Sequence, residues 1–218
     1  MIRLGVGLSA VVLCHSLCVS ASLADTMLVA NLTNDGEPGG VTPTLTTGEP
    51  RPASFGTATF VLNDDMTSMT MDIEVHNLDF TGSQTTDTND NLTAAHIHAS
   101  PTVTPTTNAG VVWGFFGLPF NDNDPNDQVV TPFATGVGGT ITGKWDAPEG
   151  QNTTLADQLN NLLTQHAYVN FHTSQFGGGE IRGMILVIPE PGTALIAAIA
   201  AVGLLGWRQR RSFSSSST

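Results

Sequence analysis

Residues 57–76, TATFVLNDDMTSMTMDIEVH, alternate apolar and polar side chains in two runs that flank an acidic turn. Alternation with a period of two is typical of a β-strand that buries one face and exposes the other. The apolar positions are Ala58, Phe60 and Leu62 in the first run and Met69, Met71, Ile73 and Val75 in the second. The stretch therefore predicts two strands, each with one buried face.

Short runs of the same kind recur on both sides of this stretch. They cover residues 27–32, 92–98, 110–116, 139–145, 168–173 and 180–188. The connectors are rich in Gly, Thr, Asn and Pro, which favour turns and loops. They cover residues 34–52, 81–91, 100–108 and 121–132. Many short strands with these connectors predict an all-β fold, an antiparallel sandwich or barrel.

One short helix is predicted near residues 154–165. Thr154 is followed three residues later by Asp157, which is the pattern of a helix N-terminal capping box. The leucines that follow fall on one face of such a helix, and they are Leu155, Leu159, Leu162 and Leu163.

The N-terminal end differs in composition from the middle of the chain. Arg3, the apolar stretch 4–19 and the small residues up to Ala24 match a signal peptide, so we expect signal peptidase to cleave after Ala24. Both cysteines, Cys14 and Cys18, lie in this apolar stretch. The mature domain should then lack cysteine, which excludes disulfides, thiol catalysis, thiolate zinc sites and iron–sulfur clusters.

The C-terminal end carries three features in a fixed order. Pro189, Glu190 and Pro191 precede an apolar run at 193–207, and the cluster Arg208, Arg210 and Arg211 follows it. As a helix at ~1.5 Å per residue the run covers roughly 23 Å, less than the ~30 Å of a hydrocarbon core. We expect it to span a membrane only with help from its flanks, with the arginines on the cytoplasmic side.

This order resembles the PEP-CTERM sorting signal of bacteria. The resemblance implies that an exosortase-type peptidase processes the tail and that the protein passes to the cell surface or an extracellular polysaccharide matrix. A plain membrane anchor is the alternative. The predicted division is a signal peptide at 1–24, one β domain at 25–188, a sorting signal with a short transmembrane helix at 189–211, and a serine-rich tail at 212–218.

The middle of the chain is strongly acidic. Between Asp25 and Ile188 three basic residues stand against eighteen acidic ones, a net charge of −15. Such a charge argues against nucleic acid or an anionic membrane surface as a partner. It favours solubility outside the cell.

Two stretches are similar to the CHRD domain, a module named after chordin and also found in microbial secreted proteins. The first is AAHIH at 94–98, followed after a loop by GVV at 110–112. The second is YVNFHT at 168–173, followed by GGEIRGMI at 178–185. The resemblance implies an extracellular all-β domain and no defined catalytic mechanism. We therefore expect binding or scaffolding of extracellular polysaccharide or surface proteins, and no enzyme activity.

Three histidines fall on the polar side of two of the predicted strands. Strand alternation places His96 and His98 on one face, opposite Ile97. His172 likewise lies opposite Val169 and Phe171. Because the apolar alternates should face the core, we expect the three imidazoles on the solvent side.

If the strands are neighbours, the three imidazoles would share one site, with Glu180 and Arg182 beside it. The set is either a hydrogen-bonded polar cluster or a copper or zinc site. The H-x-H pair resembles the copper ligands of copper–zinc superoxide dismutase, so a secreted metalloenzyme is the alternative function. The glycine-rich and cysteine-containing signatures of that enzyme are absent here.

A second set of candidate metal ligands lies in the acidic segment 121–127. Asp122, Asp124 and Asp127 alternate with other oxygen-bearing side chains, as calcium ligands do. The segment lacks the glycine and glutamate of an EF-hand loop, having Asn126 and Pro132 at those positions. A solvated loop is the alternative.

Overall fold

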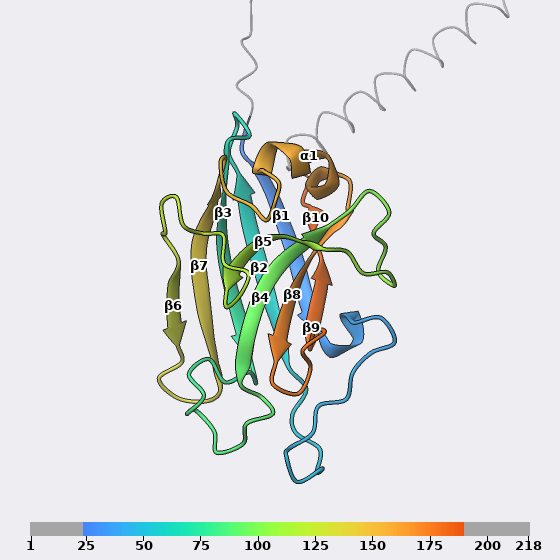
Figure 1. Cartoon of the computed structure of the whole chain (residues 1–218), viewed down its shortest axis with the longest axis vertical. Coiled ribbons are helices and arrows are strands. Elements are labelled where there is room, and N and C mark those ends of the chain that lie inside the picture. The colour runs from blue at the N-terminus through green and yellow to red at the C-terminus, as the bar shows by residue number, and fades with distance from the viewer. Residues whose placement is uncertain (1–23, 190–218) are drawn as a thin grey trace, which may run out of the picture.

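The structure is a computed structural model that describes residues 24–189 (Figure 1). Its strands are β1 (Thr26–Thr33), β2 (Phe55–Leu62), β3 (Ser68–His76), β4 (Leu92–Ala99), β5 (Val111–Phe116), β6 (Val129–Pro132), β7 (Gly138–Asp146), β8 (Ala167–Thr173), β9 (Ile181–Met184) and β10 (Leu186–Val187). Its helices are the 3₁₀ turn η1 (Asn34–Gly36) and the α-helix α1 (Leu155–Leu163). This composition confirms the predicted all-β fold with one short α-helix.

All the strands belong to one antiparallel sheet. The strand order is β5-β4-β8-β9-β1-β2-β3-β7-β6, with β10 paired to β1. The sheet curls, so that β4, β5 and β8 lie across from β2, β3 and β7 (Figure 1). Trp113 of β5 stacks on Trp145 of β7 with ring centroids 5.5 Å apart, although the two strands lie far apart in the strand order. The hydrophobic core therefore fills the inside of the curl.

The stretch that predicts two strands forms the hairpin of β2 and β3. The two strands pair from Leu62 with Met69 to Phe55 with His76. The apolar residues at every second position face the core and are buried. In β3 these residues are Met69, Met71, Ile73 and Val75. Their polar neighbours lie on the outer face.

Helix α1 begins at the predicted cap. The Thr154 hydroxyl accepts the backbone N–H of Asp157 at 3.3 Å, and the Asp157 carboxylate accepts the N–H of Thr154 at 3.0 Å. This reciprocal capping box satisfies two donors that the first turn of a helix leaves free. Leu155 and Leu162 are fully buried, so the helix closes one end of the core.

Two features differ from the sequence prediction. Part of the predicted loop 121–132 is the edge strand β6, which pairs with β7 although its side chains are largely exposed and show no alternation. The predicted strand 180–188 is two strands, since β9 pairs mainly with β8 and β10 pairs with β1. Ile185 lies between them and donates its N–H to the carbonyl of Ala167 at 2.9 Å. The chain thus changes partner strands at this residue.

The described chain begins and ends at the same end of the domain, next to α1 (Figure 1). Ile188 donates its backbone N–H to the carbonyl of Met27 at 2.9 Å, so the last residues lie beside the first strand. Ala24 and Pro189 are exposed. The rest of the predicted signal peptide and the tail from Glu190, with its arginines and predicted transmembrane helix, lie outside the described residues. Within residues 24–189, no helix has the length and apolar character that crossing a membrane requires.

Candidate metal centre

Three histidines from two neighbouring strands meet on one face of the sheet. Strands β4 and β8 are paired in a register that sets His98 beside Tyr168 and Ala94 beside His172. His96, His98 and His172 each place one ring nitrogen within 4.8 Å of the others. Their alternates Ile97 and Phe171 point into the core and are fully buried. Among the described residues, no other set of three His, Cys, Asp or Glu side chains comes together in this way.

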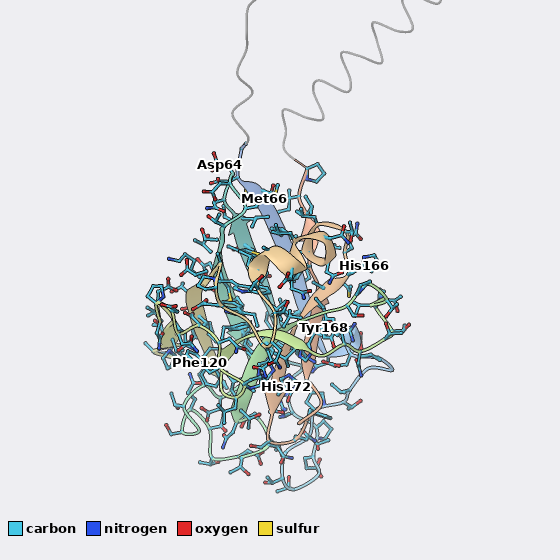
Figure 2. The ribbon with its side chains drawn as sticks, turned by 45° about the horizontal axis from the view of Figure 1, so that its top comes forward. Asp64, Met66, Phe120, His166, Tyr168 and His172 are labelled. Carbon is cyan, nitrogen blue, oxygen red and sulfur yellow. The ribbon has the colours of Figure 1, made fainter. Side chains whose placement is uncertain are left out.

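The histidines are not on a solvent-exposed surface, and this part of the sequence expectation is wrong. Only 5% of His96 and 8% of His98 and of His172 are exposed. The face away from the core is covered by loops, which reach the rings with backbone carbonyls from Ala109, Leu118 and Gly177. Strands β4 and β8 are therefore buried on both faces. Figure 2 shows His172 and Tyr168 within the body of the domain.

Each histidine has one ring nitrogen fixed by a backbone carbonyl. His98 uses Nδ1 towards the carbonyl of Ala109 at 2.9 Å, and His172 uses Nδ1 towards that of Gly177 at 3.1 Å. His96 uses Nε2 towards the carbonyl of Leu118 at 3.1 Å. A carbonyl oxygen only accepts hydrogen bonds, so these three nitrogens carry the protons.

The tautomers leave three lone pairs on the remaining nitrogens. These are Nδ1 of His96, Nε2 of His98 and Nε2 of His172. Nε2 of His98 is buried and has no hydrogen-bond partner. Nδ1 of His96 lies 3.2 Å from Nε2 of His172, and two lone pairs at this distance repel each other unless a proton or a metal ion lies between them.

Burial holds the histidines in their neutral form. Loss of hydration is the largest cause that lowers the pKa of His96 and of His98 to about 4, with the neighbouring histidines adding to the effect. Loss of hydration also lowers the pKa of His172. At neutral pH the rings are therefore uncharged, which is the form that binds metal.

An outer layer of side chains supports His98. The Tyr168 ring stacks on the His98 ring with centroids 4.8 Å apart and planes 1° from parallel. The guanidinium carbon of Arg182 lies 3.5 Å from the centroid of the same tyrosine ring. Arg182 also donates hydrogen bonds of 2.8 to 3.0 Å to Thr107, Thr104 and Asn108, in the loop that supplies the Ala109 carbonyl. Arg182 thus fastens this loop over the site.

A glycine lets a second loop approach His96. A Cβ on Gly114 of β5 would overlap the backbone carbonyl of Pro119 and lie 3.0 Å from Cδ2 of His96. No larger residue fits here without displacing the loop that carries the Leu118 carbonyl. The close contact of loop, strand and ring therefore depends on the missing side chain.

The carboxylate of Glu180 has partners other than the histidines. It accepts hydrogen bonds from Arg51 at 2.5 Å, Ser54 at 2.5 Å and Thr173 at 2.6 Å. Arg51 and Glu180 form an ion pair whose side chains are almost fully buried. Strand alternation predicted that Glu180 lies beside the histidines. Nothing in the sequence indicates that its partners are Arg51 and Ser54, which are distant along the chain.

The three aspartates expected to hold calcium do not converge. Asp122 is fully buried while Asp124 is exposed, so their carboxylates face different surroundings. Asp127 is engaged by Lys144 at 3.2 Å. Loss of hydration is the main cause that raises the pKa of Asp122 to about 6, and the nearby acids Asp127, Glu149 and Asp146 raise it further.

Comparison with family models gives two matches. The CHRD domain model matches residues 28–185, which is more than half of the chain. The chain belongs to the CHRD domain family. The model of the PEP-CTERM protein-sorting motif matches residues 187–211. No match was returned from the curated proteins or from the solved structures.

The order of these two matches has a direct consequence for where the CHRD domain works. A CHRD domain followed by a PEP-CTERM motif marks an exported protein of the cell envelope that an exosortase-type system processes. Neither family is a family of enzymes. The histidines at 96, 98 and 172 all lie inside the CHRD match, so they are part of the exported domain.

Proposed function

We propose that this CHRD domain is an extracellular metal-binding module and that His96, His98 and His172 hold the ion. The observation that carries the proposal is the closeness of the three rings, each of which has one ring nitrogen within 4.8 Å of the others. Three backbone carbonyls fix three tautomers, and each tautomer leaves its second ring nitrogen free to accept. A hydrogen-bonded cluster without an ion would pair these nitrogens with donors, whereas Nε2 of His98 has none.

The spacing of the nitrogens suits a small transition metal. At zinc–nitrogen distances of ~2.0–2.1 Å, two tetrahedral ligand atoms lie roughly 3.3 Å apart. Nδ1 of His96 and Nε2 of His172 are 3.2 Å apart, close to this value. The third nitrogen lies somewhat farther away, within 4.8 Å, so binding requires a small inward movement of His98.

The ligand type narrows the choice of metal to zinc or copper. Neutral imidazoles suit zinc and copper, whereas calcium and magnesium prefer oxygen ligands. The carbonyl partners also match the usual environment of metal-binding histidines, whose second ring nitrogen donates to a carbonyl or carboxylate. These partners orient the rings before the ion arrives.

The test is metal binding by the domain spanning residues 25–188 after removal of bound metal with a chelator. Titration with zinc or copper in a calorimeter should give one ion per chain. A His96→Ala/His98→Ala variant should lose this binding, and a single His98→Gln variant should weaken it while leaving more of the site intact. A His76→Ala variant, altered on the outer face of β3, serves as the matched control. Equal binding by all four proteins would refute the proposal.

A second candidate function is binding of a neutral polysaccharide on the outer face of the sheet. A shallow hollow of about 410 Å³ on β2 and β3 favours it. Its lining combines an exposed aromatic ring, hydroxyls and carboxylates, supplied by Phe55, Thr57, Thr59, Asp72 and Glu74. Such a surface offers stacking and hydrogen bonds to sugar rings, and its acidity disfavours anionic polymers.

This second candidate is tested by retention on immobilised polysaccharides. We expect retention on dextran but not on alginate, and loss of retention in a Phe55→Ala variant. Phe55 is 49% exposed and stacks on His76, another lining residue, with centroids 4.7 Å apart, so its removal leaves the core unchanged. Retention that is the same with and without Phe55 would exclude this face.

A further inference from the structure

The histidine site offers an ion only neutral ligands. Within residues 24–189, no carboxylate or thiolate joins His96, His98 and His172. A divalent ion held there would keep its full charge of 2+ in surroundings from which water is largely excluded. An uncompensated buried charge is strongly unfavourable.

The charged groups nearest to the site do not compensate the ion. Arg182 lies on the far side of the Tyr168 ring and is itself positive. The negative charge of Glu37 acts on Arg182. The Glu37 carboxylate lies beside Asn170 and Gly179, so close to the glycine that a Cβ there would overlap it. These two charges offset one another. Glu180 is occupied by Arg51.

Three protein ligands also leave the coordination of the ion incomplete. Zinc is almost always four-coordinate when its role is structural, and sites with three protein ligands keep a position for a molecule from solution. The polar side chains around the histidines include Asn170, Glu37 and Arg182, and Nε of Arg182 is buried without a hydrogen-bond partner. The surroundings of the site are therefore polar enough to accept a small hydrophilic species.

We propose that the fourth ligand of the ion is a small anion taken from solution. This inference rests on the proposed metal site and adds the chemical class of its ligand. An anion supplies both the missing coordination and the missing negative charge. Entry is limited by size, because the loops that carry the Ala109, Leu118 and Gly177 carbonyls leave each histidine less than a tenth exposed. A linear anion such as azide should enter, and a bulky tetrahedral anion such as phosphate should not.

The experiment replaces the metal by Co²⁺, whose visible absorption reports the number and type of its ligands. The metal-free domain is loaded with one equivalent of Co²⁺ and titrated with azide, and in parallel with phosphate at the same ionic strength. We expect azide to shift the cobalt bands in a saturable manner and phosphate to leave them unchanged. Widening the entrance in an Arg182→Ala variant, which frees the 100–110 loop, should allow phosphate to act as well.

The outcomes separate this inference from the proposal beneath it. Co²⁺ bound at one equivalent with bands that azide does not alter would overturn the anion site and leave the metal site standing. An equal response to azide and phosphate in the wild-type domain would overturn the size limit. Failure of the wild-type domain to bind Co²⁺, zinc or copper would overturn the metal site itself.

Discussion

Acidification should destabilise the metal-free domain through its buried histidines. The pKa of His96 and of His98 is lowered to about 4, mainly by burial, from an ordinary value of 6.5. The unfolded chain therefore binds more protons than the folded domain between these two values. Stability is fully present above pH 6.5 and is lost as the pH falls from 6.5 towards 4.

The size of the loss follows from the shift. A change of one pKa unit corresponds to about 1.4 kcal/mol, so a shift of roughly 2.5 units in one histidine corresponds to about 3 kcal/mol. The two contributions do not simply add, because the neighbouring histidines interact and a proton on His98 or His172 lowers the pKa of His96 further. We expect the free energy of unfolding to fall by about 3 kcal/mol between pH 7 and pH 4, a large part of the stability of an ordinary domain.

Urea denaturation of the domain 25–188 at a series of pH values measures this loss. Buried acids also titrate in this range, so the informative quantity is the difference in pH dependence between the wild type and a His96→Gln/His98→Gln variant. The variant should be less stable at pH 7 but should lose less stability on acidification. A His76→Gln variant is the control and should follow the wild type. Parallel curves for the wild type and the double variant would refute the reasoning.

Three further changes test other parts of the structure. Asp122→Asn should stabilise the domain by about 1–2 kcal/mol at pH 7 and by little below pH 4, because the raised pKa of about 6 makes ionisation unfavourable in the folded state; urea midpoints at both pH values decide this. Glu180→Gln should cost about 3 kcal/mol by leaving Arg51 buried without its ion pair, and a thermal melt would show the loss. Arg182→Lys should weaken zinc binding about tenfold through the loop over His98, measured by calorimetry at a temperature at which circular dichroism shows the variant to be folded.

The strands could be predicted because burial of one strand face makes apolar and polar residues alternate in the sequence. Met69, Met71 and Ile73 are apolar at every second position because one face of β3 packs on the core. The sequence of β6 shows no such alternation. This exposed edge strand is held by backbone hydrogen bonds to β7, so its side chains need not alternate. The pattern of side chains indicates which residues are buried. It does not reveal a strand that pairs through its backbone while its side chains stay exposed.

The same distinction explains what could be foreseen of the histidine site. Alternation correctly placed Ile97 in the core and the histidines on the other face. It could not show that this other face is covered, because the covering groups are backbone carbonyls of loops that any residue type would supply. It also assigned Glu180 to the wrong partners, since Arg51 lies 129 positions away in the sequence.

The position of the histidines relative to the chain ends bears on how sorting and binding are combined. The described chain starts and ends beside α1, while the turn between β8 and β9, which supplies the Gly177 carbonyl, lies at the opposite end of the domain (Figure 1). The PEP-CTERM match begins at residue 187, directly after the CHRD match ends at 185. The three histidines and the residues that contact their rings all lie between positions 94 and 184, so processing of the tail removes none of them. The sorting motif and the histidine site can therefore act independently, one directing the domain to the envelope and the other remaining complete once it is there.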